Sequence, residues 1–97
     1  MTIQEFRASI EKTAPPAGLP VALQSLWQDA KGDWSAAHKL VQSCEGEASC
    51  DWVHAYLHRR EGDLNNAGHW YRRAGKPVSQ DALEAEWAQI AGALLAT

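Results

Sequence analysis

The sequence has few cations and no long apolar run, and each shortage argues against a class of protein. Nine Lys and Arg against twelve Asp and Glu give a net charge of −3, so the chain lacks the excess of cations that duplex nucleic-acid binders use. The apolar runs are too short for a bilayer, and charges interrupt the N-terminus where a signal peptide has an apolar core. We therefore expect a cytoplasmic protein that binds neither nucleic acid nor a membrane.

β-Branched residues are also scarce. Val, Ile and Thr together number ten, against seventeen Ala and nine Leu. Ala and Leu lose little conformational freedom in a helix, whereas β-branched residues suit a pleated sheet. With 97 residues, the chain is long enough for one domain. The expected fold class is all-α, with about six helices.

Prolines, glycines and helix-capping residues divide the single helical domain expected over 1–97 into four segments. Thr2 and Glu5 have the spacing of a capping box and predict a helix near the N-terminus. Prolines and glycines then interrupt the chain before and after the central region, and Ser79 or Asp81 is expected to cap the last helix. The predicted segments are an N-terminal helix in 1–14, a first hairpin in 20–46, a second hairpin in 49–76 and a C-terminal helix in 79–97.

The two predicted hairpins look like copies of one unit. A shift of thirty residues places Gly32 and Asp33 on Gly62 and Asp63, and it aligns the apolar positions of the helices that follow. Glycine adopts the left-handed conformation that ends a helix, and the Asp carboxylate accepts an N–H bond at the start of the next one. Each unit is therefore predicted to be helix, Gly-Asp turn, helix.

The second unit, EGDLNNAGHWYRRAG, resembles the tetratricopeptide repeat, with an Ala at 67, an aromatic residue at 71 and an Ala at 74 after its Gly-Asp turn. The first unit, KGDWSAAHKLVQSC, keeps only the Gly, the Asp and the first Ala. This resemblance implies stacked helical hairpins that present a concave face to a peptide or protein, with atypical terminal helices as covers. The segment WVHAYLHRREGDLNNAGHWYRRAG also resembles a segment found in a group of short microbial proteins. This second resemblance implies no particular activity.

Charge is unevenly distributed along the chain. Residues 54–76 carry a net charge of +3, which leaves −6 for the rest of the protein. Arginine forks bind carboxylates and phosphates in a bidentate manner, so we expect the second hairpin to bind an acidic or phosphorylated protein segment. Two alternatives remain open: the arginines pair with the protein's own acids, and the aromatic residues belong to the core. The expected partner-binding residues are Trp52, Tyr56, Arg59, Arg60, His69, Arg72 and Arg73.

The histidines support a second hypothesis, a small enzyme or a ligand- or metal-binding protein. His54 and His58 stand four residues apart, so both imidazoles can reach one metal ion, with Glu61 as a third ligand. However, Ala55 stands where an HExxH zinc-protease helix has its catalytic Glu. A hydrogen-bonded or solvated histidine face without metal is the alternative.

No other motif indicates catalysis. The sequence has no CxxC pair, glycine-rich phosphate loop or nucleophile elbow. Cys44 and Cys50 flank a short loop, and in a cytoplasmic protein we expect them to be reduced thiols. The sequence therefore favours a noncatalytic interaction module without a cofactor, acting as a monomer or homodimer, over an enzyme.

Overall fold

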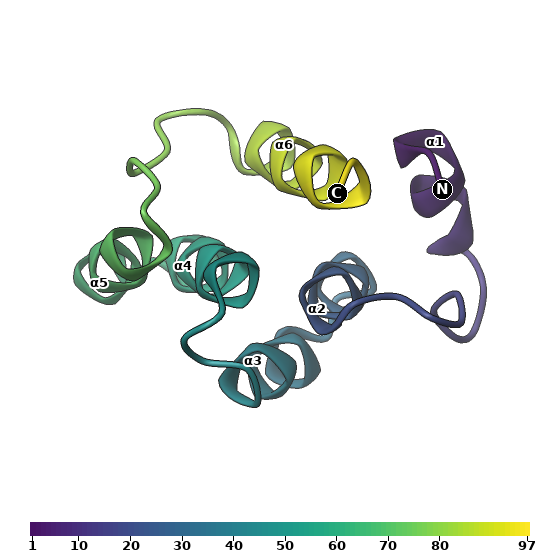
Figure 1. The fold of residues 1–97 in the computed structure, drawn as a ribbon, viewed down its shortest axis with the longest axis horizontal. Coiled ribbons are helices and arrows are strands. Elements are labelled where there is room, and N and C mark those ends of the chain that lie inside the picture. Colours follow the sequence, from purple (N-terminus) through teal and green to yellow (C-terminus); the bar gives the residue numbers. More distant parts are fainter.

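The computed structural model describes all residues, 1–97, and contains six helices and no strand (Figure 1), which confirms the expected all-α fold. The helices are α1 (Ile3–Ser9), α2 (Val21–Ala30), α3 (Trp34–Gln42), α4 (Ala48–Glu61), α5 (Leu64–Ala74) and α6 (Leu83–Leu95). None of them combines the length and the apolar character that crossing a bilayer requires.

Consecutive helices pair through the two Gly-Asp turns, α2 with α3 and α4 with α5. Gly32 and Gly62 both have a positive φ, +86° and +89°, which a residue with a Cβ adopts only with strain. The carboxylates of Asp33 and Asp63 accept hydrogen bonds from backbone N–H groups in the first turn of α3 and α5. The turns predicted from the sequence are thus confirmed in both hairpins.

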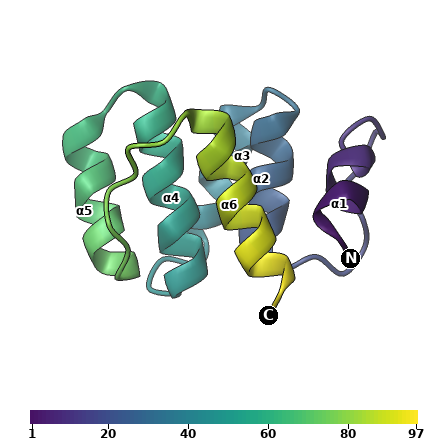
Figure 2. The ribbon, with the colours of Figure 1, turned by 90° about the horizontal axis from the view of Figure 1, so that it is seen from above.

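The remaining helices close the core on one side. α3 packs against α4, so the two hairpins are adjacent, and α6 lies against both α2 and α4. The short helix α1 packs on α6 at the far end of the molecule from α5 (Figure 2). Because α4 contacts α2, α3, α5 and α6, it is the most enclosed helix, and nine of its residues are buried.

The two terminal helices begin differently. Thr2 and Glu5 form the predicted capping box at the start of α1, each side chain accepting a hydrogen bond from the other residue's backbone N–H. At α6 the prediction was wrong, because Ala82 occupies the N-cap position and makes no side-chain cap. The Ser79 hydroxyl instead accepts a hydrogen bond from the Asp81 N–H within the preceding loop.

The expectation of reduced thiols was also wrong, since Cys44 and Cys50 form a disulfide bond. α3 ends at Gln42, and the chain turns through Gly46 before α4 begins at Ala48. This turn brings the two cysteine Cα atoms to 6.0 Å, within the range that a disulfide spans. The loop between the two hairpins is therefore closed by a covalent bond.

Candidate functional site

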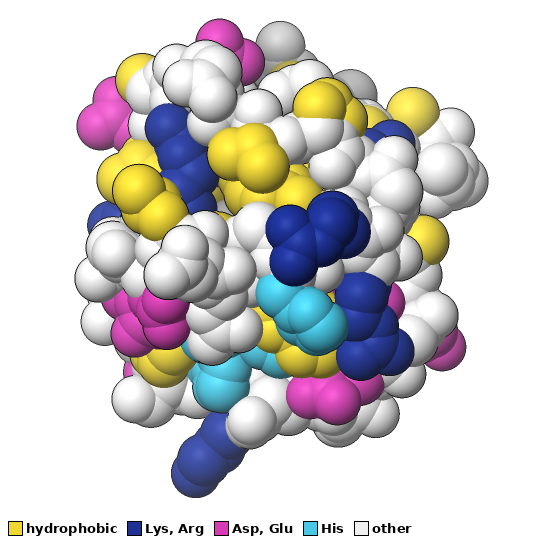
Figure 3. All heavy atoms as spheres, turned by 90° about the vertical axis from the view of Figure 1, so that its left-hand side faces the viewer, with side chains coloured by type: hydrophobic (Ala, Val, Ile, Leu, Met, Phe, Trp, Pro, Cys, Tyr) yellow, Lys and Arg dark blue, Asp and Glu magenta, His cyan; other side chains and the backbone are white.

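The outer face of α5 carries an exposed group of cationic and imidazole side chains. His69, Arg72 and Arg73 are exposed, and Lys76 follows directly after the helix. Positions 72 and 73 are three and four residues after position 69, so these three side chains share one side of the helix, whereas Lys76 lies beyond the helix end, after Gly75 in the left-handed conformation. Figure 3 shows Lys, Arg and His side chains gathered on this face of the molecule. We call these four residues the α5 basic face.

No acidic side chain pairs with the α5 basic face. The three ion pairs of the structure are His58–Glu61, Arg59–Glu86 and Arg60–Asp29. Two of the cations on the face instead lie over indole rings, Arg73 at 4.8 Å from the Trp70 ring and Lys76 at 4.3 Å from the Trp52 ring. The positive charges of this face are therefore not neutralised by direct contacts within the protein.

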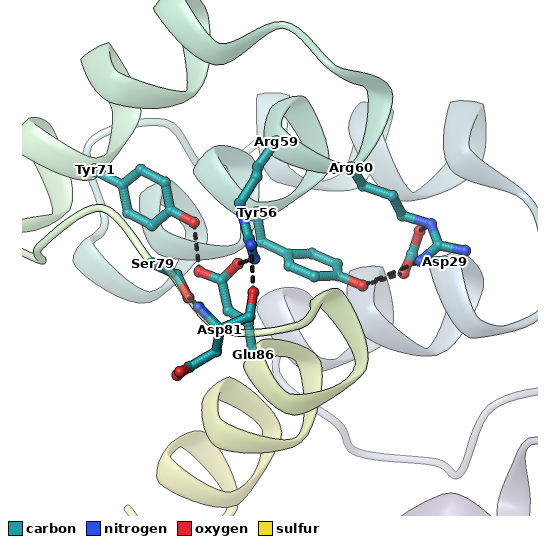
Figure 4. Close-up of polar contacts among 8 residues, drawn as sticks. All are labelled: Asp29, Tyr56, Arg59, Arg60, Tyr71, Ser79, Asp81 and Glu86. Atoms are coloured by element: carbon teal, nitrogen blue, oxygen red, sulfur yellow. Dashed lines mark hydrogen bonds and ion pairs between the residues drawn. The ribbon is translucent and has the colours of Figure 1, made fainter.

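Arg59 is held in a network with the buried carboxylate of Glu86 (Figure 4). Its guanidinium donates to Glu86 Oε1 at 2.8 Å and to the carbonyl oxygen of Asp81. The Tyr71 hydroxyl donates to the other oxygen of Glu86, and burial together with this carboxylate raises the pKa of Tyr71. Arg59 thus joins α4 to the start of α6 rather than standing free for a partner.

Arg60 belongs to a second network, with Asp29 and Tyr56 (Figure 4). Arg60 Nε lies 3.3 Å from Asp29 Oδ1, and the Tyr56 hydroxyl donates to Asp29 Oδ2 at 3.3 Å. Burial raises the pKa of Asp29, and the positive charge of Arg60 opposes this effect. Burial, with the nearby Asp29 charge, also raises the pKa of the Tyr56 hydroxyl.

The residues expected to bind a partner therefore divide into two groups. Trp52 and Tyr56 are core residues, 8% and 1% exposed, so they do not offer open ring faces as expected. For Arg59 and Arg60 the structure shows the alternative, pairing with the protein's own acids Glu86 and Asp29. Only His69, Arg72 and Arg73 lie exposed with no acidic partner, and Lys76 joins them.

The raised pKa of Asp29 leads to a testable pH dependence. A carboxyl group whose pKa is higher in the folded than in the unfolded protein contributes stability at low pH, and this contribution falls as the pH rises through the folded-state pKa. The difference in unfolding free energy between wild type and Asp29→Asn should therefore decrease as the pH rises above about 4, the ordinary pKa of an Asp side chain. Urea unfolding at several pH values measures it. A difference that increases with pH would mean that attraction to Arg60 outweighs burial.

Three histidines from two helices meet between α3 and α4. His38 comes from α3, and His54 and His58 come from successive turns of α4. One ring nitrogen of each lies within 4.8 Å of the other two, and the Nε2 atoms of His38 and His54 are 3.2 Å apart. His54 and His58 are buried, whereas His38 is half-buried. We call these residues the three-histidine cluster.

Two indole rings and one carboxylate surround the three-histidine cluster. Trp34 stacks on His38, and Trp70 stacks on His54 with ring centroids 3.9 Å apart. Glu61 accepts from His58 Nδ1 at 2.6 Å. Burial, followed by the charges of neighbouring residues, lowers the pKa of His54 to about 3 and also lowers that of His38. Both of these imidazoles are therefore neutral at physiological pH.

The cluster differs from the ligand set expected from the sequence, which was His54, His58 and Glu61. Glu61 contacts the Nδ1 side of His58, while His38 completes the group that contains His54. His38 is sixteen residues before His54, in the other hairpin, so no spacing within one helix relates the two. Only the packing of α3 against α4 brings them together.

The fold and these side chains define a small all-α protein of paired helices, with an exposed basic face on α5 and a three-histidine cluster beneath it. No protein-family model, no curated protein and no solved structure matches the chain. The functional argument therefore depends on the geometry of the two sites.

Proposed function

We propose that the protein is a noncatalytic interaction module that binds an acidic or phosphorylated protein segment through the α5 basic face. The observation that carries this proposal is that Arg72 and Arg73 are exposed side by side and pair with no acid of their own chain. Seven of the nine Lys and Arg side chains form no ion pair, and three of these seven belong to the α5 basic face, although the net charge of the protein is −3.

Two further features support a protein partner on α5. Leu64, 67% exposed at the start of the same helix, adds apolar surface at one end. The tetratricopeptide-like pattern of the two Gly-Asp turns supports the same proposal, since such repeats act as scaffolds for peptides.

The chemistry of recognition would be bidentate hydrogen bonding to carboxylates or phosphates. The Arg72 guanidinium is free of ion pairs, and the Arg73 guanidinium is oriented by its contact with Trp70. A planar fork held in place loses less freedom when it binds an anion than a free lysine side chain does. His69 on the same side of α5, and Lys76 exposed just beyond the helix, contribute further donors.

The test is a binding titration of two labelled peptides, one rich in glutamate and one containing phosphoserine, at low and moderate salt. The double variant Arg72→Ala, Arg73→Ala should weaken binding by roughly tenfold or more, because each charge-assisted hydrogen bond contributes about 1.5–3 kcal/mol. Binding to the wild type should also decrease with added salt, since exposed charges are screened. Comparing the two peptides shows whether carboxylates suffice or phosphate is needed.

Lys12→Ala with Lys39→Ala is the matched control. It removes the same number of positive charges from exposed positions outside α5. If binding depends on the α5 basic face, this control should bind like the wild type. Equal losses in both double variants would mean that net charge alone drives the association, and wild-type affinity in the arginine variant would exclude the proposed face.

A further inference from the structure

We propose that His38, His54 and His58 form a binding site for one divalent transition-metal ion, with Zn²⁺ as the first choice. The site is distinct from the α5 basic face, and this proposal does not depend on the function proposed for that face. Its ligands would come from α3 and α4, one from each side of the contact between the two hairpins.

The distances within the cluster suit a metal ion. In a tetrahedral zinc site with Zn–N bonds of about 2.0–2.1 Å, two ligand nitrogens are about 3.3–3.4 Å apart. His38 Nε2 and His54 Nε2 are already 3.2 Å apart. One ring nitrogen of each of the three histidines lies within 4.8 Å of the other two, so a small approach of the side chains would complete three corners of the tetrahedron.

His58 is held in the tautomer that a metal ligand requires. Its Nδ1 lies 2.6 Å from the Glu61 carboxylate, which can only accept, so Nδ1 carries the proton. The Asn66 amide donates to Nε2 at 3.4 Å, consistent with a lone pair on that nitrogen. A carboxylate behind a ligating histidine is the common outer-shell arrangement of zinc sites, where it orients the ring and increases its basicity.

The cost of burying these side chains also calls for an explanation. His54 is 2% exposed, and its Nδ1 has no hydrogen-bond partner. Buried polar atoms without partners are rare, and they destabilise a fold unless they serve another purpose. An apolar side chain at this position would stack on Trp70 without that cost. A metal ion bound through His54 Nε2, the nitrogen that faces His38, would explain why an imidazole is buried at this position, although its Nδ1 would stay without a partner.

The donor set selects the class of ion. Three imidazoles without a thiolate or carboxylate ligand favour zinc, copper, nickel or cobalt over magnesium and calcium, which prefer oxygen. Three protein ligands leave a fourth position for water or an anionic group. The half-buried His38 leaves the cluster partly open to solvent, which provides a path for the ion.

The experiment is calorimetric titration of the untagged, metal-free protein with Zn²⁺, and separately with Mg²⁺, in the absence of reductant. Leaving out the reductant keeps the Cys44–Cys50 disulfide intact, so that Cys44, Cys50 and Glu47 do not offer a competing thiolate site. We expect one zinc ion per chain, no response to Mg²⁺, and an increase in melting temperature of several degrees with excess zinc.

Three variants test which residues form the zinc site. His38→Gln should weaken zinc binding by roughly tenfold or more, and Glu61→Gln, behind His58, by about 10–100-fold. His69→Gln is the matched control, because His69 is the one remaining histidine, is exposed on α5, and stands outside the cluster. It should bind zinc like the wild type. Circular dichroism verifies that each variant is helical.

The wild type alone also provides a decisive measurement if a variant fails to fold. Co²⁺ bound in place of zinc should give the intense visible absorption of a four-coordinate site, and added Zn²⁺ should abolish it. Absence of zinc binding by the wild type, a weak six-coordinate Co²⁺ spectrum, or equal losses in His38→Gln and His69→Gln would each overturn the proposal.

Discussion

Replacing Glu86 by Ala should lower the free energy of unfolding by about 3–5 kcal/mol, because removing one partner of a buried ion pair leaves the other without compensation. Glu86 is 1% exposed and accepts hydrogen bonds from both Arg59 and Tyr71. Without it, the Tyr71 hydroxyl and the Arg59 guanidinium would each lose their carboxylate partner in a region with little access to water. Since small domains are stable by only about 5–15 kcal/mol, this is a large fraction of the total.

Glu84→Ala is the control for this prediction. Both glutamates lie in the first turn of α6, so both interact with the positive end of the helix dipole to a similar extent. Glu84 is exposed and forms no ion pair, so its replacement should change stability by no more than about 0.5 kcal/mol. Urea unfolding followed by circular dichroism compares the two. Similar losses for both variants would mean that the network around Glu86 contributes nothing beyond the helix dipole.

Replacing Trp87 by Ala should cost about 3–5 kcal/mol and loosen α1 more than the hairpins. The Trp87 ring stacks on Phe6 at 5.6 Å between centroids, and its Nε1 donates to the carbonyl oxygen of Leu26 at 3.1 Å. This one side chain therefore joins α6 to α1 and to α2. Because α6 is the helix against which α1 packs, loss of the indole leaves a cavity where α1 is attached.

Hydrogen exchange distinguishes local from general loosening in Trp87→Ala. The amides of α1 should exchange faster relative to those of α4 than they do in the wild type. Trp87→Phe is the control, since it keeps a ring against Phe6 and loses only the hydrogen bond and part of the volume, at a cost of about 1–2 kcal/mol. If α1 and α4 lose protection to the same degree in Trp87→Ala, then α1 does not depend on this contact.

The local features of the fold could be predicted from the sequence because they depend on neighbouring residues. The capping box of Thr2 and Glu5 and the Asp33 and Asp63 caps all form within a few residues of chain. The positive φ of Gly32 and Gly62 is likewise a local requirement of a chain reversal. The start of α6 at Ala82 was not predictable in this way, since no side chain caps it.

The roles of the cations could not be read from the sequence. Arg59, Arg60, Arg72 and Arg73 look alike in two neighbouring segments, but the first two face buried carboxylates on α6 and α2. The distances in sequence from Arg59 to Glu86 and from Arg60 to Asp29 are 27 and 31 residues. The packing of α4 between α2 and α6 gives Arg59 and Arg60 acidic partners within the fold, and this packing cannot be read from the sequence. Arg72 and Arg73 remain exposed.

The sequence by itself determined the helical class, the two Gly-Asp hairpins and the presence of His54 and His58 on one helix, because periodicity and capping act over a few residues. Tertiary structure decided which side chains face one another across helices. It placed Tyr56 in the core, closed the Cys44–Cys50 disulfide and brought His38 to His54. The physical reason is that a helix has several faces, and only packing against its neighbours selects the one that each residue meets.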